Sequence, residues 1–183
     1  MRESRLIEGL IRKDRNAQHT LLKQYGDFVF AAIARMIPRT EDVEEVYQDV
    51  FMKVLNSIRT YNGNLASLRT WITRIAYNES VSFLRHRQPD TVSLEEVWDV
   101  ADTVAESDMD VLFGTADEET VLRLESAIAL LPAEDQALIT MFYYDDLSLK
   151  DIAYVINSLP TTVASRLSRI RKRLYGIIKT AQR

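Results

Sequence analysis

The sequence contains no cysteine, only five glycines and four prolines, and no long apolar run. The lack of cysteine excludes disulfides and thiolate metal sites. The two histidines, His19 and His86, are too few and too far apart in the sequence to indicate a metal site or a catalytic base. Because no apolar stretch reaches the length of a membrane span or a signal-peptide core, we expect no membrane insertion and a cytoplasmic protein.

Two further absences concern catalysis. The chain has no phosphate-binding GxxxxGK[ST] loop and no cluster of acid and base residues, and an enzyme site needs groups of this kind. We therefore expect a protein that is not an enzyme and that holds no cofactor and no metal.

The residues that are present predict helices. Hydrophobic residues make up 46% of the 183 positions, which is enough for packed cores, and no alternating run rich in Val, Ile and Thr predicts a strand. Apolar residues at helical spacing predict a short helix around residues 6–11 and longer ones over 16–36, 41–58 and 68–87. The expected fold class is all-α.

Charge is segregated along the chain. Residues 90–119 hold eleven Asp or Glu and no Lys or Arg. Because the whole chain has a formal charge of −4, the remaining residues together carry +7. This acidic stretch has the composition of a flexible linker, so we expect two small helical domains, residues 1–88 and 120–183, joined by an acidic linker at 89–119.

The stretch from Ser148 to Leu174 predicts a helix-turn-helix. Ser148 is suited to cap a first helix, with Asp151 three residues later, and Asn157 tolerates the left-handed conformation of a helix end. Pro160 marks the start of a second helix. Its apolar residues recur at spacings of four and three and predict an inward face: Val163, Leu167, Ile170 and Leu174.

The second helix of this motif is strongly basic. Residues 160–183 contain seven Lys or Arg and no Asp or Glu. A charge run on a single helix is often only a solvated face, but a surface of one sign attracts a phosphate backbone. In a helix-turn-helix the N-terminal part of the second helix faces the bases, where Arg166 and Arg169 could read guanine.

Three stretches of the chain resemble one known family. EDVEEVYQDVFMKV, TWITRIAYN followed by LRHR, and the region from DQALITMFYYDDLSLKDIAYVI to TVASRLSRIRKRL are similar, in order and spacing, to the small two-domain extracytoplasmic-function (ECF) group of bacterial RNA polymerase sigma factors of the sigma-70 type. The resemblance implies a transcription initiation factor that binds core RNA polymerase and promoter DNA and captures the melted strand. Such factors often have an inhibitory partner, so an anti-sigma factor is expected as well.

The resemblance also implies roles for particular residues. The C-terminal domain would read the −35 promoter element through Thr162, Ser165, Arg166, Arg169, Lys172 and Arg173. The N-terminal domain would bind the −10 element through Tyr61, Asn62, Asn64, Arg74, Asn78 and Arg85. Polymerase would be bound by Glu44, Glu45, Gln48, Asp49 and Phe51.

Plainer alternatives stand beside these roles. Trp71 is in phase with Ile72 and Ile75 and is expected in the core rather than against a base, and Phe51 is also expected to be mainly a core residue. The loop around Gly63 has a composition that suits a simple turn. For the whole chain, the alternatives are a stand-alone helix-turn-helix repressor or activator, and an interaction protein whose acidic segments bind a basic partner.

The acidic linker suggests one more hypothesis. Carboxylates between residues 95 and 119 are expected to mask the cations Arg166, Arg169 and Arg173 in the free protein and to enter a nucleic-acid channel on polymerase. Trp98 or Phe113 would serve as an apolar anchor.

Overall fold

The computed structural model describes residues 3–87 and 118–180. Every regular element within these ranges is helical, as expected for the all-α class. The N-terminal domain contains α1 (Glu3–Ile11), α2 (Arg15–Ala34), α3 (Thr40–Ser57), the 3-10 turn η1 (Ile58–Thr60) and α4 (Leu68–Arg87). The C-terminal domain contains α6 (Glu118–Ala129), α7 (Ala133–Ile139), the π-helical turn η3 (Thr140–Tyr144), α8 (Leu149–Ile156) and α9 (Pro160–Thr180).

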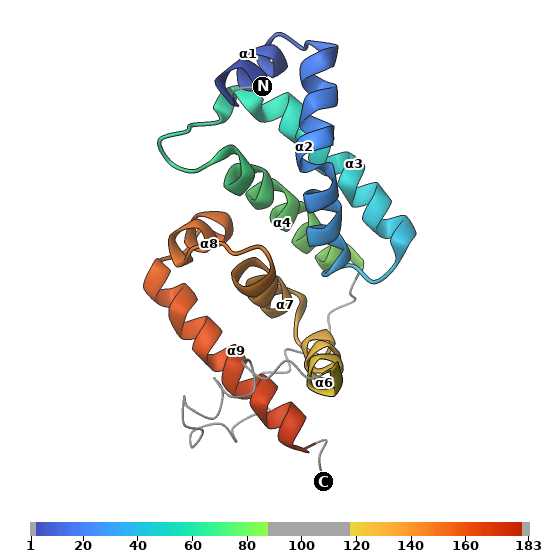
Figure 1. Ribbon diagram of the computed structural model, residues 1–183, viewed down its shortest axis with the longest axis vertical. Coiled ribbons are helices and arrows are strands. Elements are labelled where there is room, and N and C mark those ends of the chain that lie inside the picture. Colours follow the sequence, from blue (N-terminus) through green and yellow to red (C-terminus); the bar gives the residue numbers. More distant parts are fainter. Residues whose placement is uncertain (1–2, 88–117, 181–183) are drawn as a thin grey trace.

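The N-terminal domain is built on the packing of α2, α3 and α4, with α1 at its far end (Figure 1). Asp14 caps α2 by accepting hydrogen bonds from the backbone nitrogens of Asn16 and Ala17 at 2.6 and 3.3 Å. Most of the apolar residues at helical spacing are buried, among them Leu21, Val29, Ile33, Val46, Val50 and Ile72. Leu22, which the spacing also places on the apolar face of α2, is 43% exposed, because that face is wider than the surface its neighbours cover. Trp71 is 7% exposed, which confirms that it is a core residue.

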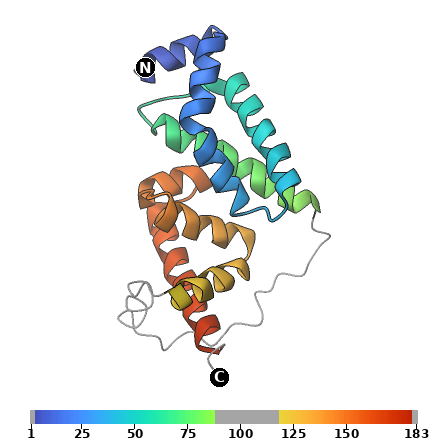
Figure 2. The same ribbon diagram turned by 45° about the vertical axis from the view of Figure 1, so that its right-hand side comes forward.

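The C-terminal domain packs directly against the N-terminal domain. In both views α4 lies along α7 and α8, and the C-terminal part of α9 points away from the N-terminal domain (Figures 1 and 2). The sequence predicted two domains but not this contact between them. The linker proposed at residues 89–119 falls almost wholly outside the described ranges, and α6 already begins at Glu118.

Among the helices of the described ranges, none combines the length and the apolarity that a membrane crossing requires.

Candidate nucleic-acid interface

The helix-turn-helix forms as the sequence predicts. The Ser148 side chain accepts a hydrogen bond from the backbone nitrogen of Asp151 at 3.1 Å, and its hydroxyl donates to Asp151 Oδ2 at 2.5 Å. Helix α8 ends at Ile156, and the next residue, Asn157, has a φ of 53° and a ψ of 53°, which place it in the left-handed region. This residue turns the chain toward α9, which begins at Pro160.

Helix α9 has one apolar face and one polar face. Val163, Leu167, Ile170, Leu174 and Ile178 are all buried, so the predicted inward spacing is confirmed and extended by one turn. This packing fixes the rotation of α9 about its axis. It leaves Thr162, Ser165 and Arg169 exposed to solvent along the N-terminal half of the helix.

Two of the arginines predicted on this surface contact acidic residues of α7. Arg166 Nη2 lies 3.0 Å from Asp135 Oδ1 and 3.8 Å from Glu134 Oε2, and Arg173 Nη1 lies 3.4 Å from Asp135 Oδ2. Their side chains are 27% and 31% exposed, and Lys172 is also half-buried. Arg169 is therefore more accessible than the other arginines named for this surface.

The second predicted DNA surface begins in the loop before α4. Asn62 Oδ1 accepts a hydrogen bond from the backbone nitrogen of Asn64 at 3.0 Å, which closes a tight turn around Gly63. Both asparagine side chains are exposed. The loop can therefore be a simple turn and also bind DNA, because this hydrogen bond fixes the backbone and leaves the exposed side-chain amide of Asn64 available.

Tyr61 anchors this loop. Its ring packs edge-to-face on Trp71, with 5.6 Å between the centroids. Its hydroxyl oxygen lies 3.1 Å from the carbonyl oxygen of Ala66 and 3.3 Å from Glu3 Oε1. Burial, followed by the negative charge of Glu3, raises the pKa of Tyr61, so the phenol remains a hydrogen-bond donor at neutral pH.

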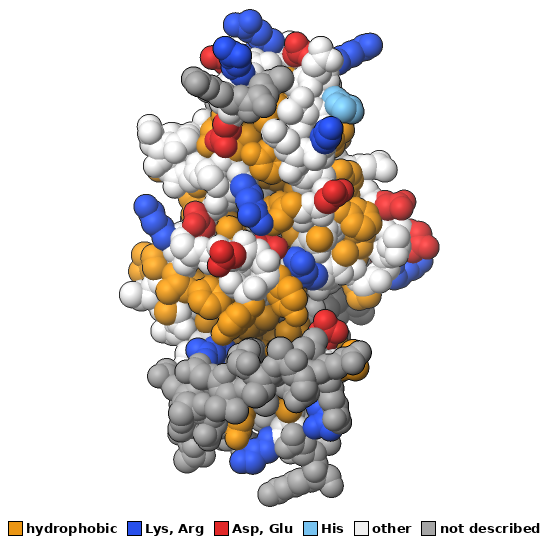
Figure 3. Space-filling view, viewed as in Figure 1, with side chains coloured by type: hydrophobic (Ala, Val, Ile, Leu, Met, Phe, Trp, Pro, Cys, Tyr) orange, Lys and Arg blue, Asp and Glu red, His pale blue; other side chains and the backbone are white. Residues whose placement is uncertain are grey.

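The α4 residues predicted to bind DNA face the C-terminal domain in two of three cases. The Arg74 guanidinium stacks on the ring of Tyr154 of α8 at 4.8 Å, and Arg85 Nη2 lies 2.9 Å from Glu134 Oε1 of α7. Asn78 is exposed. Figure 3 shows the face of the molecule that is seen in Figure 1. Lys and Arg side chains are dispersed over that face, and hydrophobic side chains are gathered over α7 and α8.

Comparison with known proteins decides the family. Residues 21–89 match the family model "Sigma-70 region 2", and residues 122–174 match "Sigma-70, region 4". The chain is also 27% identical over 174 residues to the ECF RNA polymerase sigma factor SigW of Bacillus subtilis (strain 168), and the match covers 92% of each chain. The chain belongs to the ECF group of the sigma-70 family. It is a transcription initiation factor that recognises promoters, and sigma factors of this family are not themselves catalysts.

Two solved structures share the fold. The structure of CnrH in complex with the cytosolic domain of CnrY superposes with a TM-score of 0.67 at 18% identity and covers 96% of each chain. The sigma factor RpoE from Bartonella quintana, in complex with the anti-sigma factor NepR, gives a TM-score of 0.62 at 23% identity and covers 88% of this chain and 96% of that chain. At these identities the likeness concerns the fold alone.

The acidic face of this sigma factor lies on α3. Glu44, Glu45, Gln48 and Asp49 are exposed, whereas Phe51 is 5% exposed and packs on Tyr47 with 4.8 Å between the ring centroids. A groove of about 360 Å³ opens beside this face, between α2 and α3. It is lined by Gly26, Asp27, Phe30, Glu44, Tyr47 and Gln48.

Sequence reasoning missed the acidic partners of the sigma factor's basic residues. Glu134, Asp135 and Asp145 were not singled out, although the first two stand in the sequence AED at the start of a helix. Acidic residues in a first turn are a common effect of the helix dipole, so that pattern alone gave no sign of contacts to Arg166. The masking contacts expected of residues 95–119 fall on a segment that lies mostly outside the described ranges.

Proposed function

We propose that this sigma factor uses α9 to read the −35 element, α4 and the loop before it to capture the melted −10 element, and the acidic face of α3 to dock on core RNA polymerase. The observation that carries the proposal is the polar face of α9, whose N-terminal half carries Thr162, Ser165 and Arg169 at the position where a helix-turn-helix meets the major groove.

In the −35 assignment the side chains have different tasks. Arg169 is exposed and long enough to donate two hydrogen bonds to a guanine, while Lys172 contacts phosphate. Arg166 and Arg173 are ordered by Asp135 at 3.0 and 3.4 Å. Arg166 would reach a base only after it exchanges part of this contact for DNA.

In the −10 assignment the loop supplies the pocket and α4 supplies the charge. Asn62 and Asn64 project polar groups that can pair with an extruded base, and Tyr61 fixes the loop against Trp71. Arg74, Arg85 and the Asn78 amide would hold the backbone of the single strand. Strand separation would then be stabilised by binding, without hydrolysis of any substrate.

In the polymerase assignment the exposed residues of α3 provide the contact. Glu44, Glu45, Gln48 and Asp49 form a negatively charged surface that complements a basic partner, and the apolar walls of the adjacent groove can receive an apolar side chain. Phe51 supports this face from inside the core.

The cellular location of the protein follows from its proposed partner, RNA polymerase. We place the protein in the cytoplasm, where RNA polymerase works, and assign it no catalytic activity and no cofactor. An anti-sigma factor is a further proposed partner, and a supporting observation is that the RpoE structure of similar fold contains the anti-sigma factor NepR.

Reconstituted transcription tests the proposal. Core polymerase with the purified protein should initiate at a subset of a promoter library, and polymerase alone should not. A variant with both Arg169→Ala and Asn64→Ala should lose that selectivity while its helical circular-dichroism spectrum stays unchanged. If the protein binds duplex DNA tightly without polymerase and never redirects initiation, it is a stand-alone helix-turn-helix regulator.

A further inference from the structure

Glu3, in the first turn of α1, contacts the loop that is assigned to the −10 element. Its Oε1 lies 3.3 Å from the hydroxyl oxygen of Tyr61, and the two residues are 58 positions apart in the sequence. Tyr61 is the first residue of the loop between η1 and α4. The match to sigma-70 region 2 begins at residue 21, so α1 lies outside it and receives no role from it.

Tyr61 is the residue around which this loop folds. Its hydroxyl oxygen lies 3.1 Å from the carbonyl oxygen of Ala66, near the end of the loop. A Cβ atom on Gly63 would lie 3.3 Å from the same hydroxyl oxygen, so the turn passes directly over the phenol. The ring itself packs on Trp71. The position of the phenol therefore sets the position of the turn and of the two asparagines that flank Gly63.

The two oxygens near the Tyr61 hydroxyl have different effects on the loop. The carbonyl of Ala66 belongs to the loop, so a bond to it closes the loop on itself. The carboxylate of Glu3 belongs to α1, so a bond to it ties the loop to the body of the domain. A phenol has one hydrogen to donate, and a carboxylate is a stronger acceptor than a neutral carbonyl. Glu3 thus limits the movement of the loop relative to the domain.

Helix α1 is firmly enough held to serve as a support. Leu6 and Leu10 are 1% and 2% exposed, which anchors the helix in the core. A Cβ atom on Gly9 would lie 2.6 Å from the Cβ atom of Ala17, so α1 and α2 cross in close contact. Helix α1 also packs against η1, directly before the loop (Figure 1). Glu3 is therefore presented to the loop from a fixed element.

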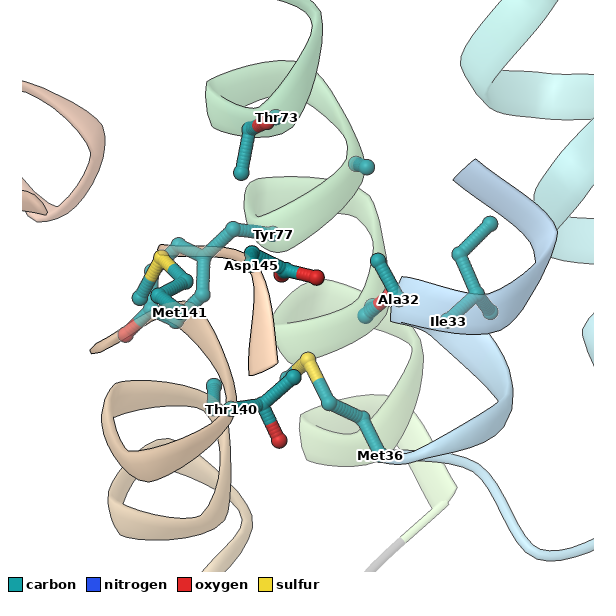
Figure 4. A pocket seen from close by; sticks show the side chains of 11 residues that line it. Ala32, Ile33, Met36, Thr73, Tyr77, Thr140, Met141 and Asp145 are labelled. Carbon is teal, nitrogen blue, oxygen red and sulfur yellow. The ribbon is translucent and has the colours of Figure 1, made fainter. Parts of the chain in front are cut away.

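The contacts that hold Tyr61 lie within the N-terminal domain. Further along α4, Thr73 and Tyr77 border a small cavity together with Met141 and Asp145 of the C-terminal domain (Figure 4). The hydrogen bonds and the ring contact of Tyr61 come instead from α1, from the loop itself and from the first turn of α4. This support of the loop therefore persists wherever the C-terminal domain lies on a promoter.

We propose that Glu3 is a positioning residue for capture of the melted −10 strand. It acts through the Tyr61 hydroxyl and holds the loop where Asn62 and Asn64 can meet an extruded base, and it does not touch DNA itself. The inference rests on the −10 role proposed above. A loop that is already held in its binding conformation loses less conformational entropy when it binds. Removal of Glu3 is therefore expected to weaken strand capture, although Glu3 is negatively charged.

Two plainer roles of Glu3 predict different results. A carboxylate near a DNA surface repels phosphate, so its removal would strengthen binding of any strand. An acid in the first turn of a helix stabilises that helix through the dipole, which requires the charge that glutamine lacks. The positioning role requires an acceptor oxygen, which glutamine keeps and alanine lacks. The sign of the effect and the order of the two variants separate these roles.

The test measures strand capture by the polymerase holoenzyme assembled with the full-length chain. The probe is a fluorescent single-stranded oligonucleotide with the non-template −10 sequence that the natural holoenzyme selects from a randomised pool, and a scrambled oligonucleotide is the reference. The variants are Glu3→Ala, Glu3→Gln, Tyr61→Phe and the double variant of Glu3→Ala with Tyr61→Phe. Glu8→Ala removes another exposed carboxylate of α1 and is the matched control. Circular dichroism checks that each variant is folded.

Glu3→Ala should bind the selected strand about threefold to tenfold more weakly than the natural chain, the effect of one hydrogen bond. Binding of the scrambled strand should not change. Glu3→Gln should retain most of the affinity, and Glu8→Ala should match the natural chain. Tyr61→Phe should also weaken capture, and adding Glu3→Ala to it should cause no further loss, because the hydroxyl through which Glu3 acts is already absent.

Unchanged or tighter binding of the selected strand by Glu3→Ala would refute the positioning role. Equal losses in Glu3→Gln and Glu3→Ala, or additive losses in the double variant, would refute it as well. Failure of the proposed function has a different result, since the natural holoenzyme itself would then select no −10 strand or would bind the scrambled strand equally well. In that case the −10 assignment is wrong, and the role of Glu3 falls with it.

Discussion

Arg35 and Asp145, which are 110 residues apart in the sequence, form an ion pair across the two domains, with 3.1 Å between Nη1 and Oδ1. The Asp145 side chain is only 4% exposed, whereas that of Arg35 is 36% exposed. Burial raises the pKa of Asp145, and the positive charges of Arg35 and Arg69 only partly oppose that shift. The pair thus orients the domains, while the buried charge of Asp145 limits how tightly they close.

The first prediction concerns pH. A carboxyl group whose pKa is raised in the folded protein binds a proton more readily there than in the unfolded chain. The protonated Asp145 therefore stabilises the folded protein at pH values below 3.8, the ordinary pKa of the carboxyl group. This stabilisation is lost as the pH rises through the raised pKa of Asp145 in the folded protein. Compared with Asp145→Asn, which cannot titrate, the natural protein should gain stability as the pH falls from 7.

Urea unfolding of both proteins at a series of pH values measures this difference. If the stability of the natural protein relative to Asp145→Asn does not change with pH, Arg35 balances burial at this site. If that relative stability falls on acidification, Arg35 outweighs burial.

The second prediction concerns base reading by α9. Arg169→Ala in the polymerase holoenzyme should cost about 1–3 kcal/mol of promoter binding and relax preference at one upstream position, because a bidentate contact to guanine is lost. Lys172→Ala should weaken all sequences evenly, because a phosphate contact carries no sequence information. Selection of promoters from a randomised upstream region distinguishes the two. Equal and sequence-blind losses would mean that Arg169 also contacts only phosphate.

The third prediction concerns polymerase docking. Reversing the charges of Glu44, Glu45 and Asp49 to Lys should weaken binding to core polymerase by more than tenfold. Each change is at an exposed position, where substitutions typically alter the free energy of unfolding by no more than about 0.5 kcal/mol. Affinity is measured by competition with the natural factor. Glu8→Lys on the exposed side of α1 is the control, and equal effects of the two sets would indicate a general charge effect instead of a docking site.

The fourth prediction concerns the turn between α8 and α9. Asn157 has a φ of 53°, so a β-branched residue there is strained. Asn157→Val should lower the free energy of unfolding by about 1–2 kcal/mol, whereas Asn157→Gly should not lower it, because glycine adopts this conformation without strain. Thermal unfolding of both variants provides the comparison. If both lose stability equally, the Asn157 side chain matters more than its backbone conformation.

The sequence determined the helices of the N-terminal domain, the helix-turn-helix and most of their inward faces, but it did not place α6 and α7. Apolar residues at helical spacing placed α2, α3, α4 and α9 and identified their buried positions, because a helix of a small domain must bury one stripe against its neighbours. The Ser148 cap and the left-handed Asn157 were also predictable, since both depend on contacts within one turn of chain. The resemblance to sigma factors, carried by three stretches in order, is confirmed by the two family models.

Only the tertiary structure decided which carboxylates meet the basic residues. Arg85 and Glu134 are 49 residues apart, and Arg35 and Asp145 are 110 apart. Helical spacing shows that an arginine lies on a polar face, but every exposed acid in the chain is then an equally good partner. The choice depends on how α4 packs on α7 and α8, which is set by the shapes of two domain surfaces built from residues distant in sequence. For that reason the packing of the two domains, and with it the contacts of Glu134, could not be predicted from the spacing of residues within one helix.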